Sequence, residues 1–132
     1  MPRAALYSID VVAITARLGE LSILLRRAPG AGRARWALPW GVPRERERIA
    51  AGGLRVAREA LGGPPAWIEQ VGAFGDAARH PSELPLSVAF AAVVPDEAAD
   101  RAPDGEWFPT SAHPPLPERQ QQLLREAIAA LT

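Results

Sequence analysis

Two short segments of the chain are almost entirely apolar, and they constrain the fold more than any other sequence feature. Residues 9–16 (IDVVAITA) and 86–94 (LSVAFAAVV) are rich in alanine and β-branched residues, as expected of buried strands. Neither approaches the run of about 20 apolar residues that crosses a membrane. Both segments therefore predict interior strands of a water-soluble domain.

The rest of the chain alternates between strand and helix patterns. Further strands are predicted at 21–27, 36–40, 67–74 and 106–109, helices at 48–61 and 118–131, and loops at 29–35, 75–85 and 95–105. Gly62-Gly63-Pro64-Pro65 should end the first helix, and Gly52 and Gly53 inside it should let it approach a sheet closely. Strands precede, separate and follow two helices, which predicts an α/β or α+β class with a mixed sheet. Residues 1–132 fit a single domain.

Composition narrows the possible chemistry. The chain has 15 basic residues, all arginine, and 15 acidic residues, so its net charge is zero. This balance argues against a nucleic-acid coat or a polybasic membrane surface. The absence of cysteine excludes disulfides and cysteine-ligated metals, and two histidines disfavour a multi-histidine zinc site. Metal chemistry would have to use carboxylates and a hard cation such as Mg²⁺. The N-terminus shows no signal-peptide pattern, so we expect a cytoplasmic protein with no membrane association.

The segment from 41 to 63 carries the candidate chemistry. Its spacing of Gly41, Glu47, Arg55, Glu59 and Gly62 resembles the Nudix box, G-x5-E-x7-R-E-U-x-E-E-x-G-U, where U is a bulky apolar residue. The flanking segments WALPWG (36–41) and EWFP (106–109) resemble Nudix segments as well. The resemblance covers nearly the whole chain. It implies an α/β/α sandwich with a mixed sheet and two main helices, and a Mg²⁺-dependent attack of water on a diphosphate.

The box departs from the family pattern at positions that matter for catalysis. Val56 and Ala60 stand where the family has glutamates, and positions 56, 59 and 60 have the i, i+3, i+4 spacing of one helix face. The resemblance leaves Glu59 and Glu47 as candidate metal ligands, with Arg55 as the third candidate catalytic residue. Arg55 and Glu59 could instead form a helix-surface ion pair, and Glu47 could simply favour the positive end of the helix.

A second match concerns the ligand. Phe74-Gly75-Asp76, Arg79 and SVAF (87–90) resemble a run found in Nudix domains of the ADP-ribose pyrophosphatase type and in Nudix-related regulators of NAD metabolism. It implies a nucleotide-type small molecule such as ADP-ribose. Guanidinium groups can hold its phosphates and aromatic rings can stack on its base. The candidate ligand-binding residues are Arg27, Arg35, Trp36, Trp40, Phe74, Asp76 and Arg79.

Further expectations concern partners and individual side chains. The regulators carry a DNA-binding domain after the Nudix part. Because this chain ends at Thr132, we expect no such domain here. The resemblance also implies a possible homodimer. Trp40 replaces a glycine of the family pattern and could narrow or block the pocket. His80 and His113 fall in predicted loops and are expected to be solvated.

Three functions remain open at this point. The first is a Nudix-fold module that binds an ADP-ribose-like ligand with little or no hydrolysis. The second is a Mg²⁺-dependent pyrophosphohydrolase that recruits carboxylates from outside the box. The third is an interaction scaffold in which Trp40 fills the former pocket. Val56 and Ala60 count against catalysis, whereas Phe74-Gly75-Asp76 and Arg79 favour a ligand.

Overall fold

A computed structural model describes residues 5–28, 35–75 and 78–131. Within them the chain forms a mixed sheet of seven strands with three helices. The elements are β1 (Tyr7–Arg17), β2 (Glu20–Arg27), β3 (Trp36–Ala37), β4 (Trp40–Gly41), α1 (Ile49–Leu61), β5 (Trp67–Phe74), β6 (Leu86–Val93), α2 (Asp96–Ala99), β7 (Glu106–Pro109) and α3 (Glu118–Ala130). The strand order is β3-β2-β1-β6-β5, while β4 pairs with β1 and β7 pairs with β2. The predicted fold class is confirmed.

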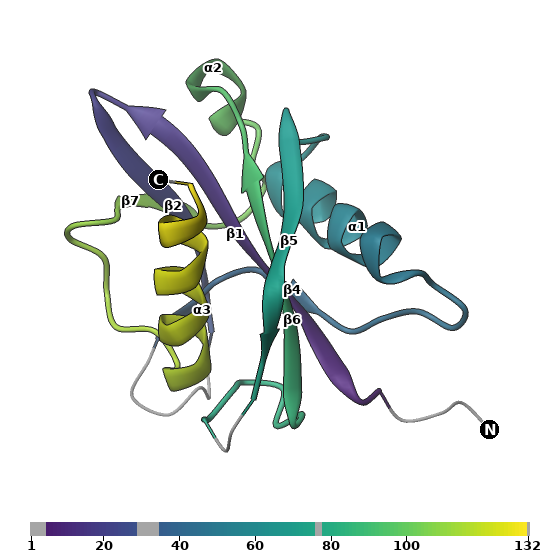
Figure 1. Ribbon diagram of the computed structural model, residues 1–132. Coiled ribbons are helices and arrows are strands. Elements are labelled where there is room, and N and C mark those ends of the chain that lie inside the picture. The colour runs from purple at the N-terminus through teal and green to yellow at the C-terminus, as the bar shows by residue number, and fades with distance from the viewer. Residues whose placement is uncertain (1–4, 29–34, 76–77, 132) are drawn as a thin grey trace.

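The two apolar segments lie side by side at the centre of the sheet. β1 and β6 pair in parallel, with Ile9 opposite Val88 and Ile14 opposite Val93, whereas the other strand pairs are antiparallel. Helices α1 and α3 cover opposite faces of this sheet (Figure 1). Successive side chains of a strand point to opposite faces, so a strand covered on both sides is apolar throughout. This explains why β1 lacks the alternation of a half-exposed strand.

The sheet separates two hydrophobic cores. Ile9, Val11 and Ala13 of β1 pack towards α1 with Val56 and Phe90. Val12 and Ile14 pack on the other face, where α3 contributes Leu123, Leu124 and Ala127.

Helix α1 begins and ends close to the predicted bounds. Gly62 ends it with φ 75°, a left-handed conformation that glycine adopts without a steric penalty, and its N–H donates to the Arg58 carbonyl at 2.9 Å. Gly52 and Gly53 face the sheet. A Cβ on Gly52 would lie 2.5 Å from Ile9 Cδ1, and one on Gly53 would lie 2.5 Å from the Phe90 ring. The expectation that small residues allow close helix–sheet approach is confirmed.

Two predictions of local structure need correction. The segment predicted as a loop at 95–105 contains the one-turn helix α2, whose ends are held by Arg17 through Asp96 at 2.6 Å and Asp100 at 2.5 Å. The strand predicted at 36–40 is two short strands, β3 and β4, which pair with different partners, β2 and β1. None of the helices in the described part of the chain has the length and apolar character needed to cross a membrane.

Candidate functional site

An ion pair between Glu47 and Arg55 organises the segment that precedes α1. Arg55 Nε donates to Glu47 Oε2 at 2.8 Å, and Arg55 Nη2 donates to Oε1 at 2.9 Å. The Arg44 backbone N–H donates to Oε1 at 3.0 Å, and Arg55 Nη2 also reaches the Val42 carbonyl at 2.7 Å. The hydrogen bonds from Arg55 lower the pKa of Glu47 from 4.5 to about 2, although burial opposes this shift. Glu47 therefore stays ionised and fixes the entry to the helix.

Glu59 lies beside this ion pair and remains exposed. Its Oε1 is 3.9 Å from Arg55 Nη1 and 3.6 Å from Arg44 Nη2, and 57% of its side chain is accessible. An exposed contact of this kind stabilises a helix by only a few tenths of a kcal/mol, roughly. The structure thus brings together the three candidate catalytic residues Glu47, Arg55 and Glu59.

Val56 and Ala60 belong to the core between α1 and the sheet. They are 3% and 2% exposed, in contrast to Glu59. Val56 lies beneath Gly41, where an added Cβ would be 3.1 Å from Val56 Cγ2. The three positions that were expected to share one face are therefore divided between core and solvent.

The described residues of α1 do not by themselves fit the magnesium site that the resemblance implies. Mg²⁺ takes six oxygen ligands in octahedral geometry, usually with one or two carboxylates. The two apolar side chains on α1 supply no oxygen, and Glu47 already accepts three N–H groups. Over residues 5–28, 35–75 and 78–131, no three acidic or histidine side chains gather as metal ligands would.

A cation–aromatic cluster lies at the end of β2. The guanidinium carbon of Arg27 is 4.6 Å from the ring centre of Trp36, and the Trp36 and Phe108 rings meet edge to face at 5.0 Å. The sheet places these residues together, since Arg27 is opposite Trp36 and Phe108 is opposite Ile23. Arg27 is exposed and Trp36 is partly buried, so the cluster offers a charge and an aromatic surface to solvent.

The other candidate ligand-binding residues are more scattered. Phe74 is partly buried and packs against the core on the α3 side. The Arg79 side chain is exposed, while its backbone N–H donates to Glu118 Oε2 at 3.3 Å and its carbonyl accepts an N–H from α3 at 2.9 Å. Arg35 is exposed, and Asp76 lies outside the described residues.

Trp40 faces away from the Glu47–Arg55 pair. It lies opposite Asp10 on β1, so its side chain is on the α3 side of the sheet, whereas the next residue, Gly41, faces α1. The Trp40 ring contacts His80 edge to face, with ring centres 5.3 Å apart.

The expectation that His80 is solvated is wrong. Its side chain is completely buried, and Nε2 lies 2.6 Å from Asp10 Oδ2. His113, also expected at the surface, is partly buried, with Nδ1 2.8 Å from the Pro114 carbonyl. The buried His80–Asp10 pair was missed because its two members are 70 residues apart and neither carries a local motif.

Comparisons with solved structures decide the fold family. The chain is similar to Shewanella oneidensis NrtR, with a TM-score of 0.82 and 25% identity over 96% of this chain and 62% of that chain. The NUDIX domain of the same protein, solved with ADP ribose, matches 98% of this chain and 90% of that chain, with a TM-score of 0.78 and 25% identity. A mutT/nudix family protein from Listeria innocua has a TM-score of 0.79 and 26% identity over 95% of this chain and 92% of that chain. The chain has the Nudix fold.

The Nudix fold confirms the family resemblance and the predicted sandwich architecture. No protein-family model matches the sequence, and no curated protein matches it at a significant level. The chain spans 62% of full-length NrtR, which is less than two thirds of that protein. In this Nudix fold, α1 is the helix that carries Arg55 and Glu59 and buries Val56 and Ala60.

Proposed function

We propose that this Nudix-fold domain binds a nucleoside diphosphate derivative of the ADP-ribose type and does not hydrolyse it. The observation that carries the proposal is the burial of Val56 and Ala60 at the two box positions where the family pattern has glutamates. These side chains pack in the core. Of the three box positions 56, 59 and 60 on α1, only position 59 carries an exposed carboxylate. One such carboxylate is a poor magnesium site, so assisted attack of water on a diphosphate has little support.

Glu47 supports the same conclusion by a different route. Its two oxygens accept two N–H groups from Arg55 and one from the Arg44 backbone. A metal ion would have to compete with this pairing for the same lone pairs. We therefore assign Glu47 and Arg55 a structural role, in which they hold the segment before α1 in place.

Ligand binding is supported by the likeness to the NrtR NUDIX domain solved with ADP ribose. The cluster of Arg27, Trp36 and Phe108 adds a chemical reason. A guanidinium group recognises phosphate oxygens by charge-assisted hydrogen bonds, and an aromatic ring recognises a base by stacking. A nucleoside diphosphate derivative carries both of these groups.

The test is calorimetry with ADP-ribose, with and without Mg²⁺, combined with chromatography of the same samples for nucleotide products. NAD, diadenosine polyphosphates and nucleoside triphosphates serve as comparison compounds. We expect saturable binding of ADP-ribose and no product. At 100 times its Kd the ligand should stabilise the fold by about 2.7 kcal/mol, which a thermal melt detects.

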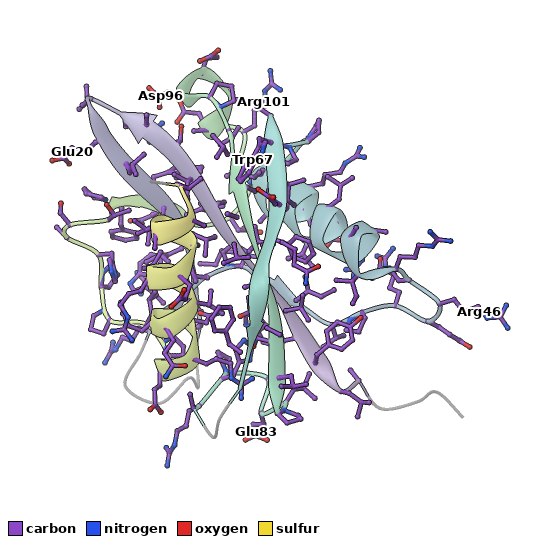
Figure 2. All side chains as sticks on the ribbon, viewed as in Figure 1. Glu20, Arg46, Trp67, Glu83, Asp96 and Arg101 are labelled. Carbon is purple, nitrogen blue, oxygen red and sulfur yellow. The ribbon has the colours of Figure 1, made fainter. Side chains whose placement is uncertain are left out.

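Arg27→Ala should weaken ADP-ribose binding about tenfold, since a lost charge-assisted contact amounts to roughly 1.5 kcal/mol. Arg101→Ala is the matched control, because this exposed arginine follows α2 (Figure 2). Turnover that requires Mg²⁺ would show a pyrophosphohydrolase instead. The absence of binding by every compound would favour the interaction scaffold.

A further inference from the structure

Within the described part of the chain, helix α3 leaves the hairpin end of its sheet face uncovered. The helix begins over the start of β6, where Arg119 Nη1 donates to Ser87 Oγ at 3.2 Å. From Arg119 to Ala130 the helix rises about 16 Å. From Ser87 to Val93 the strand extends about 20 Å, so the helix stops short of the far end of β6. In agreement, Val93 is partly exposed, and its partner Trp67 on β5 is 41% exposed.

The strand register shows which side chains lie in this uncovered area. Trp67 pairs with Val93, and Val93 pairs with Ile14, so one row of side chains runs from β5 across β6 to β1. Ile14 belongs to the core on the α3 side, and every second residue of a strand lies on the same face. The next row on this face, two residues nearer the hairpin turn, holds Ala16 and Leu21, which face each other across β1 and β2. Both of these side chains are exposed.

Charged side chains of the hairpin lie on the opposite face. Arg17 and Glu20 pair across the turn, and alternation along the strands directs both of them to the α1 side. Arg17 contacts Asp96 and Asp100 there. Glu20 and Trp67 are both labelled at this end of the sheet in Figure 2. An antiparallel strand with one face in water normally carries polar side chains on that face. The α3 side of this hairpin has the reverse pattern, which is expected of a face that a partner buries.

The hairpin turn holds a leucine in an unfavourable position. Leu18 and Gly19 join β1 to β2, with φ values of 51° and 81°. Two-residue turns with positive φ at both positions favour Asn-Gly, because a bulky side chain is strained in the left-handed region. The Leu18 side chain is also fully exposed to water. In a single chain this leucine is therefore unfavourable both for the backbone and for hydration.

We propose that this apolar face is a self-association surface, through which two copies of the chain form a dimer with twofold symmetry. The face consists of five uncharged apolar side chains, Ala16, Leu18, Leu21, Trp67 and Val93. A twofold contact places the same face of both subunits together, so apolar surface meets apolar surface and no charge of this face is buried. A second copy of the chain therefore matches this surface.

The composition of the face is typical of the centre of a protein interface. Such centres are depleted of charged residues and enriched in aromatic ones, and their rims are polar. Trp67 provides the aromatic side chain, while Glu69, on the same side of β5, is exposed at the border of the area. The dimer does not depend on the proposed nucleotide binding.

Sedimentation equilibrium of the full chain over a range of concentrations tests the dimer. We expect a reversible equilibrium between monomer and dimer. Trp67→Gln should raise the dimer Kd at least about tenfold, since truncated aromatic side chains have the largest effects at interface centres. Leu6→Asn is the matched control, because this leucine is 70% exposed beside the opposite end of β1. It should leave the Kd unchanged. Added salt should not weaken the dimer, because the contact is apolar rather than ionic.

Leu18→Asn separates association from folding. Asparagine suits the left-handed turn position, so the free energy of unfolding of the dilute monomer should not fall. The same change should raise the dimer Kd at least about tenfold, because each dimer loses two leucines from its contact. A wild-type chain that stays monomeric at about 0.1 mM overturns the proposal and leaves the face to a different partner. A dimer that salt dissociates, or one whose Kd is the same in Leu18→Asn and Trp67→Gln as in the wild type, also overturns it.

Discussion

At the scale of single residues, Glu47 makes stability depend on pH. Its pKa is about 2 in the folded chain and 4.5 ordinarily, so its contribution is complete above about pH 4.5 and is lost as the pH falls towards 2. The shift amounts to about 3 kcal/mol at most. Glu47→Gln should lower the free energy of unfolding by about 2–3 kcal/mol at pH 7 and by much less near pH 3. Urea unfolding at the two pH values measures this difference.

Glu59→Gln is the matched control for this prediction. Glu59 also approaches Arg55, but 57% of its side chain is exposed. The change should cost less than about 0.5 kcal/mol at either pH. If the two variants showed the same pH dependence, the Arg55 interaction with Glu47 would not be the source of the effect.

Residues of the candidate site were predictable to the extent that their partners are close in the sequence. Arg55 and Glu59 are one helical turn apart, and Glu47 is eight residues before Arg55, so the resemblance to the Nudix box grouped them. His80 could not be placed in this way. Its loop composition indicated solvent, but its burial depends on Asp10, a strand residue 70 positions away.

At the scale of elements, the end of α1 was predictable from the sequence, whereas the partner that Gly53 meets on the sheet was not. Glycine costs about 1 kcal/mol relative to alanine inside a helix, so Gly53→Ala should stabilise α1 in isolation. In the folded chain the new methyl group would lie 2.5 Å from the Phe90 ring, which the surrounding core holds in place. Overpacking of this kind costs about 1–3 kcal/mol. The gain in helix propensity offsets part of this cost, so we expect a net loss of up to about 2 kcal/mol, measured by chemical unfolding.

Gly63→Ala provides the comparison, because a Cβ there meets no heavy atom within 4 Å. It should change stability by less than about 0.5 kcal/mol. A stabilising effect of Gly53→Ala would mean that α1 can move away from the sheet at little cost.

The short elements were harder to predict than the long ones. Helix α1 carries its own stop signal in Gly62, whereas α2 is a single turn held by Arg17, a residue of another element. The pattern at 36–40 predicted one strand, but it could not show that two short strands, β3 and β4, pair with different partners.

At the scale of the whole molecule, the pairing of strands that are distant in the sequence could not be predicted. The apolar segments 9–16 and 86–94 indicated buried strands, yet nothing in them specified that β1 and β6 are parallel neighbours. That pairing brings Ser8 beside Ser87 and places both under the first turn of α3. The sequence pattern predicts the sandwich and its two main helices. The polar contacts among Ser8, Ser87 and α3 depend instead on the register of distant strands.

Gln120 connects three distant parts of the chain and provides the last prediction. Its side chain accepts the Leu38 N–H at 2.8 Å, donates to the Leu38 carbonyl at 3.2 Å and donates to Asp10 at 2.8 Å. Gln120→Ala would leave these buried groups without their partner, at a cost of about 2–4 kcal/mol. Gln122→Ala, a partly exposed neighbour on α3, should cost less than about 0.5 kcal/mol.

Amide hydrogen exchange gives this prediction a local readout as well as a global one. Exchange at Leu38 should speed up in Gln120→Ala by more than the change in global stability accounts for, since the amide loses its acceptor. In Gln122→Ala it should stay at the wild-type rate. Unchanged protection of Leu38 in Gln120→Ala would mean that α3 does not hold the segment between β3 and β4. The contact of Gln120 with Asp10 and the apolar contacts of Leu123, Leu124 and Ala127 would still join α3 to β1.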